Sequence, residues 1–148
     1  GDNSALIDCA ILKFMEDGNI IDSLEILSIA SKSASNSWVK ARALNNMGCL
    51  YVVQDFNFDD SRKVWDKSRR LGNGMAVQNL ESIGHIPKGR VRRLIHRMSS
   101  SNSIEINRKK YQSSIRDEFE IDLPEYGIKM STGSFVVSEF IRKTHPKI

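Results

Sequence analysis

The sequence predicts an all-α protein of stacked antiparallel helical hairpins, about three pairs, followed by a mixed helical C-terminal extension. Two observations indicate this class. Apolar residues recur at three- and four-residue spacing through most of the first 98 residues, as on one face of a helix. Short turns containing Gly or Asn separate these periodic segments. We therefore expect a helical-repeat domain over residues 1–98 and a basic, partly helical extension over residues 99–148.

The first predicted pair of helices occupies residues 3–30. Helix one, over residues 3–16, ends at Asp17-Gly18-Asn19, because Gly and Asn accept the left-handed conformation that stops helices. The second helix follows at once, with Leu24 and Leu27 on its inner side. The apolar residues that define helix one are Leu6, Ile7, Ala10, Ile11, Phe14 and Met15.

The second pair follows the polar connection SKSASNS. Ser37 is the expected cap of a helix over residues 38–53, and QDFNF forms the next turn. Asp59 and Asp60 place negative charge at the start of helix four, where the helix dipole favours it. Lys67, Arg69 and Arg70 lie near its other end, before Leu71-Gly72-Asn73.

Beyond this pair the predicted elements are less regular. Helix five spans residues 75–83, and Pro87 suits the first turn of a sixth helix over residues 88–98. SSSNS is a loop, and a further helix is expected over residues 104–119. A last helix, capped by Ser134, carries Phe135, Val136, Val137, Phe140 and Ile141 and stops before Pro146. The intervening EIDLPEYGIKMSTG has no assigned structure, and a short strand pair is one possibility.

An internal repeat connects the second and third pairs. Ala43, Asn46 and Met47 recur as Ala76, Asn79 and Leu80, each 33 residues later. Between them lies DDSRKVWDKSRRLGNGMAVQNL, which resembles the Sel-one-like form of the tetratricopeptide repeat. In that family a second helix ends at a Gly-Asn turn, and an Ala and an Asn-Leu-Gly follow.

The first helix of the second pair is similar to the family as well. Met47-Gly48-Cys49-Leu50-Tyr51 corresponds to the family's Leu-Gly-x-x-Tyr. The resemblance implies that Gly48 allows close helix approach and that Tyr51 and Trp65 fill the space between helices. It is good over residues 43–80 and loose over the first 84, and Glu81 departs from the family's Gly. An unrelated helical bundle is the alternative.

The resemblance implies a concave groove lined by the first helix of each pair. It also implies a protein-interaction module that binds a protein or peptide partner, as an adaptor, dedicated chaperone or assembly factor. Arg42, Asn45 and Gln78 are suited to bind a partner's main chain, because Asn and Gln both donate and accept. An ordinary solvated helix face is the alternative for each residue. The residues placed in the groove are Asp8, Arg42, Asn45, Cys49, Gln78 and Ser82.

A basic stretch distinguishes the C-terminal part of the chain. Residues 1–84 carry 9 Lys and Arg against 11 Asp and Glu, whereas residues 85–148 carry 13 against 7. The stretch 88–116 fits phosphates or an acidic protein, so a regulatory domain that contacts nucleic acid is the alternative function. A plain solvated helix face is the other explanation of these charges, and the favoured one. The patch residues are Lys88, Arg90, Arg93, Arg97, Arg108, Lys109 and Lys110.

The sequence contains no pattern typical of an enzyme. It has no glycine-rich phosphate loop, no His-Glu-x-x-His and no nucleophile elbow, so we expect no catalytic residues, metal or cofactor. Cys9 and Cys49 lie in apolar helical contexts and are expected to be buried reduced thiols, with a disulfide or a reactive thiol as alternatives. No apolar run is long enough to span a membrane, and no signal peptide is evident, which favours the cytoplasm. The oligomeric state is left open.

Overall fold

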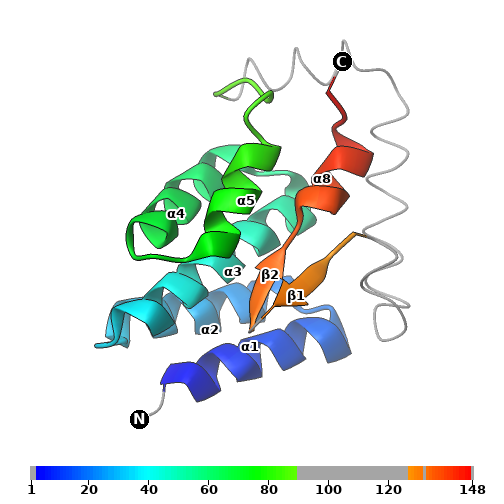
Figure 1. Ribbon diagram of the computed structural model, residues 1–148. Helices are drawn as coiled ribbons and strands as arrows, with labels where there is room; N and C mark the ends of the chain where they lie inside the picture. The colour runs from blue at the N-terminus through cyan, green and yellow to red at the C-terminus, as the bar shows by residue number, and fades with distance from the viewer. Residues whose placement is uncertain (1–2, 90–126, 132, 148) are drawn as a thin grey trace.

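The computed structural model describes residues 3–89, 127–131 and 133–147 (Figure 1). These residues are mostly helical, which confirms the coarse all-α prediction, and they also contain a two-stranded antiparallel sheet. The helices are α1 (Asn3–Asp17), α2 (Ile20–Ser33), α3 (Ser37–Asp55), α4 (Phe58–Arg70), α5 (Gly74–Ser82) and α8 (Ser138–Thr144). The strands are β1 (Lys129–Ser131) and β2 (Ser134–Val136).

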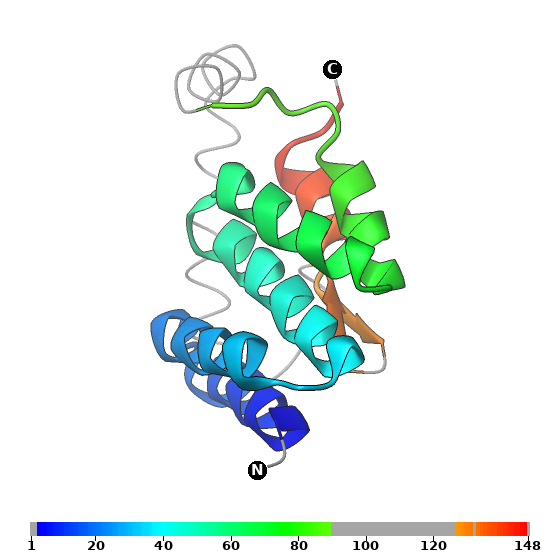
Figure 2. The same cartoon turned by 90° about the vertical axis from the view of Figure 1, so that its left-hand side faces the viewer.

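The first five helices pack in chain order, each against the next (Figure 2). Helix α3 is central, since it contacts α2 on one side and α4 on the other and β2 along a further face. Ten consecutive residues, from Ala41 to Leu50, are all buried. A helix buried all round is expected where neighbours cover it on every side.

Asparagine caps set the starts of four helices. Asn19, Asn36, Asn57 and Asn73 each accept a hydrogen bond through the side chain from a backbone N–H in the first turn. Such a cap satisfies one of the donors that a helix start leaves unpaired. The prediction that Ser37 caps the third helix is therefore wrong, because Asn36 does so and Ser37 is already helical. Helix α5 likewise begins one residue before the predicted Met75.

The segment predicted as the start of the last helix is a strand. Ser134–Val136 forms β2, which pairs with β1 so that Lys129 faces Val136 and Met130 faces Phe135. Ser134 is therefore not a helix cap, and α8 begins only at Ser138. The strand pair considered for the unassigned stretch is present, although its second strand lies in the segment expected to be helical.

Two other predicted helices fall largely outside the described residues. Lys88 and Gly89, the described residues of the predicted helix 88–98, are not helical. The rest of that helix, and the whole of the predicted helix 104–119, lie in the stretch that the structure does not describe.

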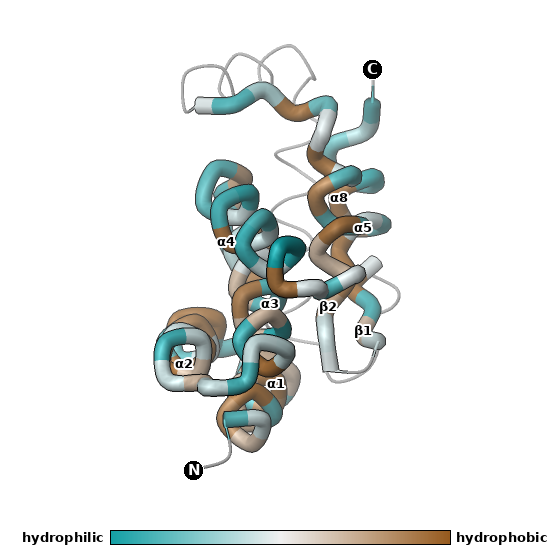
Figure 3. Tube along the Cα trace, turned by 60° about the vertical axis from the view of Figure 1, so that its left-hand side comes forward, coloured by the Kyte–Doolittle hydropathy of each residue, from teal (hydrophilic) through white to brown (hydrophobic). Residues whose placement is uncertain are grey.

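One hydrophobic core joins the C-terminal segment to the helices. Phe135 and Phe140 belong to the same buried cluster as Phe14 of α1 and Leu50 of α3. Apolar residues of α1, α3 and α5, brown in the Cα tube of Figure 3, belong to this cluster. An aromatic cluster closes the end of the core near α8, and its members are Phe56, Phe58, Phe140 and His145. The described part of the predicted extension therefore packs onto the helices.

Candidate protein-interaction groove

Three asparagines line the inner face of α3 and α5. Asn45 and Asn46 come from α3 and Asn79 comes from α5, and all three are fully buried. Buried amides need hydrogen-bond partners, because an unpaired polar group away from water costs about 1–3 kcal/mol. The partner of these amides is segment 133–137, which contains strand β2 and lies across both helices (Figure 1).

Asn46 and Asn79 bind this segment by the same two-bond arrangement. The Asn46 Nδ2 donates to the Gly133 carbonyl at 3.0 Å, and its Oδ1 accepts from the Phe135 N–H at 2.8 Å. The Asn79 Nδ2 donates to the Phe135 carbonyl at 3.2 Å, and its Oδ1 accepts from the Val137 N–H at 2.9 Å. Because strand residues alternate with period two, both amides bind main-chain groups on the same side of the segment. We call Asn46 and Asn79 the amide pair.

Asn45 orients the amide pair and adds a further bond. Its Nδ2 donates to the Phe135 carbonyl at 2.9 Å and lies 3.3 Å from the Asn46 Oδ1, while its Oδ1 accepts from the Asn79 Nδ2 at 3.0 Å. Its main-chain carbonyl accepts from the Trp65 indole N–H at 3.0 Å. The side-chain amides therefore form one connected network that is fixed to the packing of α3 on α4.

The Cys49 thiol completes the polar surface that faces the Phe135 carbonyl. Its Sγ donates to that carbonyl at 3.5 Å and accepts from the Asn79 Nδ2 at 3.3 Å. Burial raises the pKa of this thiol far above its ordinary value, and hydrogen bonds with Trp65 and Asn79 offset only part of the rise. The thiol is therefore protonated at neutral pH and acts as a donor, because only the thiolate is a nucleophile or metal ligand.

The side chains of the bound segment enter the core. Phe135 is 2% exposed and meets Phe14 edge-on, with ring centroids 5.7 Å apart. Val137 is fully buried. The Ser134 hydroxyl accepts a hydrogen bond from the Asn73 Nδ2 at 3.2 Å. Buried apolar side chains and main-chain hydrogen bonds therefore both hold the segment against α3 and α5.

Arg42 lies at one end of the groove, against Gly133. Its guanidinium is 3.7 Å from the Asp8 carboxylate, donates to the Ser4 carbonyl at 3.5 Å, and lies over the Trp38 ring at 5.5 Å from the centroid. Only 10% of its side chain is exposed, whereas the Asp8 side chain is 66% exposed. Arg42 is therefore held from several directions.

The structure places three of the residues predicted for the groove around the chain's own segment 133–137. Asn45 and Cys49 bind the segment directly, and Arg42 borders it. Gln78 is exposed, and the half-buried Ser82 donates to the Asn79 carbonyl of its own helix at 2.5 Å. In the sequence the two members of the amide pair belong to the internal repeat and are not among the predicted groove residues. Its recurrence at a 33-residue interval was the signal, because two asparagines at equivalent repeat positions face the same surface.

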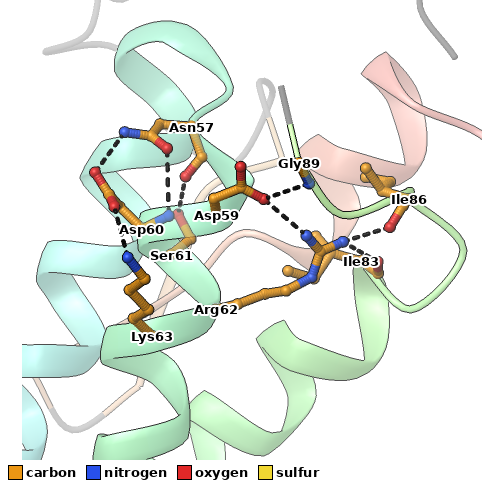
Figure 4. A network of polar contacts seen from close by, with 9 residues as sticks. All are labelled: Asn57, Asp59, Asp60, Ser61, Arg62, Lys63, Ile83, Ile86 and Gly89. Atoms are coloured by element: carbon orange, nitrogen blue, oxygen red, sulfur yellow. Dashed lines mark hydrogen bonds and ion pairs between the residues drawn. The ribbon is translucent and has the colours of Figure 1, made fainter. Parts of the chain in front are cut away.

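A second polar network anchors the segment that leads from α5 into the basic stretch (Figure 4). Arg62 of α4 binds the Asp59 carboxylate at 3.3 Å and donates to the carbonyls of Ile83 and Ile86. The Asp59 carboxylate also accepts from the Gly89 N–H at 3.2 Å. Lys88 is exposed beside this anchor.

The other members of the predicted basic patch lie outside the described residues. These are Arg90, Arg93, Arg97, Arg108, Lys109 and Lys110.

The two cysteines differ from one another. Cys49 is buried as predicted, whereas the prediction is wrong for Cys9, which is exposed because it lies on the outer side of α1. Both are free thiols. Among the described residues no group of three or more His, Cys, Asp or Glu is placed to hold a metal ion. No helix in the described ranges is both long and apolar enough for a membrane crossing.

The chain matches no family model, no curated protein and no solved structure.

Proposed function

We propose that the protein is a protein-interaction module that binds an extended segment of a partner protein across α3 and α5. Adaptors, dedicated chaperones and assembly factors work through such a surface. The observation that carries the proposal is the amide pair, which binds an extended main chain at successive two-residue steps. A side-chain amide offers a donor and an acceptor together, as a neighbouring strand does, and so suits an extended polypeptide.

The segment 133–137 is a template for the bound partner. Its main chain makes six hydrogen bonds with Asn45, the amide pair and Cys49, accepting four and donating two. These contacts involve no charged group, so they favour an extended polypeptide over a phosphate-bearing ligand. A partner segment that replaces β2 regains the same hydrogen bonds.

The packing of the helices supports a repeat of the Sel-one-like kind. The Ser61 Oγ donates to the Gly48 carbonyl on the neighbouring helix at 2.8 Å and is 2.9 Å from the carbonyl of its own cap residue, Asn57. In the preceding pair the Ser23 Oγ makes the same two contacts, to the Ala10 carbonyl at 2.9 Å and the Asn19 carbonyl at 2.8 Å. This shared geometry favours two copies of one packing unit, and proteins built from such units bind partners on their concave face.

The chain's own segment competes with any partner for this groove. A partner must therefore bind a chain from which β2 and α8 have been displaced. Weakening the internal segment without altering the groove should raise the affinity for an external one, since the competing state is then less stable.

A labelled peptide tests the proposal on the full chain. The probe is a synthetic peptide of residues 127–147, and its binding is followed by fluorescence anisotropy. We expect the Phe135→Ala chain to bind it at least about tenfold more tightly than the wild-type chain, because emptying a buried aromatic site costs the internal segment several kcal/mol. Circular dichroism checks that the variant is folded, and Val137→Ala is the milder substitute if it is not.

Groove variants provide the control. In the Phe135→Ala background, Asn79→Ala should weaken peptide binding at least about tenfold, since the N–H of residue 137 loses its partner and the carbonyl of residue 135 loses one of its three donors. Gln78→Ala, one residue away on the same helix and exposed, should leave it unchanged. Absence of peptide binding to every folded variant would contradict the proposal.

A further inference from the structure

The first residue of the bound segment, Gly133, lies against the Arg42 side chain. Gly133 has a φ of 75°, in the left-handed region that favours glycine, and a Cβ added there would lie 2.6 Å from the Arg42 Nη1. Real Cβ atoms essentially never approach another heavy atom so closely. A residue other than glycine at this position therefore strains the backbone and displaces Arg42.

The atoms that a Cβ at Gly133 would meet belong to the end of the Arg42 side chain, which is flexible but is held by three contacts. Its contacts with Asp8, the Ser4 carbonyl and the Trp38 ring hold it at the N-terminal end of α3. A shift of the guanidinium away from Gly133 would change these contacts of a side chain that is only 10% exposed. The guanidinium therefore discriminates by size, and glycine is the residue that fits.

The third and fifth positions of the segment require apolar side chains. Phe135 and Val137 enter the core, while their main-chain groups bind the amide pair. A polar side chain at either position would be buried without a partner, which is costly. The position between Gly133 and Phe135 holds Ser134, which is also buried and is bonded to the cap residue Asn73.

We infer that this groove selects partner segments of the form glycine, serine, phenylalanine, valine, valine, since residues 135–137 are all buried apolar residues, and that Arg42 imposes the glycine. The inference rests on the proposed function and narrows it to a partner class. The occupant is an extended segment in which a glycine lies two residues before a large apolar anchor. Recognition combines the amide pair, which binds main chain, with Arg42, which excludes a side chain.

A competition experiment tests the glycine requirement. Peptides of residues 127–147, unchanged or carrying Gly133→Ala or Met130→Ala, compete with the labelled unchanged peptide for the full Phe135→Ala chain. We expect the Gly133→Ala peptide to bind at least about tenfold more weakly, from the strained φ and the contact with Arg42 together. The Met130→Ala peptide should bind like the unchanged one, because Met130 is 49% exposed.

Changing Arg42 separates its contribution from backbone strain. On a chain with both Phe135→Ala and Arg42→Ala, the difference between the glycine and alanine peptides should shrink at least about threefold, as a double-mutant cycle measures. The strain of a positive φ is the same on both chains and cancels. Arg42→Gln serves in place of Arg42→Ala if that chain does not fold.

The outcomes distinguish this inference from the proposed function. If the unchanged peptide binds and the Gly133→Ala peptide binds equally well, the glycine requirement is overturned while the groove remains. If alanine weakens binding equally on both chains, Arg42 does not select glycine and that part is overturned. If the unchanged peptide binds no folded chain, the proposed function fails. A labelled full chain that enters the groove of a second copy by the same segment supports the selection rule and identifies the source of the segment.

Discussion

At Gly48 the main chain of α3 lies directly against the indole of Trp65. A Cβ built at this glycine would come within 2.3 Å of the Trp65 Nε1, and Trp65 is fully buried. The same indole N–H donates to the Asn45 carbonyl, so the contact between α3 and α4 also fixes the helix that carries the groove asparagines. These residues therefore connect the packing of the helices to the candidate site.

Removing the Trp65 indole tests the packing of α3 on α4. Trp65→Ala should lower the free energy of unfolding by about 3–5 kcal/mol, because it empties a large buried aromatic site. Trp65→Phe should cost less, since a ring remains and only the hydrogen bond to the Asn45 carbonyl and part of the volume are lost. Urea denaturation of the purified variants gives both values. A loss below about 1 kcal/mol for Trp65→Ala would contradict the packing of α3 on α4.

Two glycines allow a matched test of close approach. Gly48→Leu should destabilise the protein far more than Gly74→Leu, because no atom lies within 4 Å of a Cβ built at Gly74. Overpacking of this kind usually costs about 1–3 kcal/mol, and here the obstacle is a buried ring. Thermal melting compares the two variants. Equal melting temperatures would show that Gly48 is not a close-approach position.

The elements differ in how far the sequence could predict them. Helices α1 and α2 follow from the local spacing of apolar residues, α4 from the charged residues at its two ends, and the turns that bound α1 to α5 from Gly and Asn. Strand β2 does not, since Phe135, Val136 and Val137 run directly into Phe140 and Ile141 and fit a buried strand or a helix. Asn46 and Asn79, which are far away in the sequence, favour the strand because they bind main-chain N–H groups that a helix would use for its own hydrogen bonds. The groove helices were therefore predictable, whereas their occupant was not.

We expect the packing of β2 on α3 and α5 to depend on the amide pair, and a variant of Asn79 tests this. Asn79→Ala should lower the free energy of unfolding by about 2–4 kcal/mol, because it leaves two buried main-chain groups without this partner. The Val137 amide should lose protection from hydrogen exchange more than amides of α1 do. Gln78→Ala, exposed on the same helix, should stay within about 0.5 kcal/mol of the wild type. Unchanged protection at Val137 in Asn79→Ala would show that the amide pair does not hold the segment.

Across the whole molecule, charge and groove are separate features. The described groove is built from neutral amides, a protonated thiol and apolar side chains, with Arg42 at its edge. The positive charge belongs to residues 85–148, and Arg62 fixes the point where this part begins by binding Ile83, Ile86 and Asp59. A protein partner in the groove and an acidic partner on the basic stretch therefore predict different responses to salt.

Salt dependence and a triple variant separate the two functions. If the groove carries the function, binding of the 127–147 peptide to the Phe135→Ala chain should change less than about threefold between 50 and 200 mM salt, because screening acts on charges. Arg90, Arg93 and Arg97 changed together to alanine should leave that binding intact, while Asn79→Ala weakens it. If the basic stretch binds nucleic acid, three phosphate contacts alone predict a loss of about 40-fold in affinity for arbitrary duplex DNA over the same range. The triple variant should then lower the salt slope by about three. We expect the first pattern, because the hydrogen bonds that hold segment 133–137 come from uncharged groups. Steep, salt-sensitive DNA binding that the triple variant abolishes, together with failure of the peptide to bind, would assign the function to the basic stretch instead.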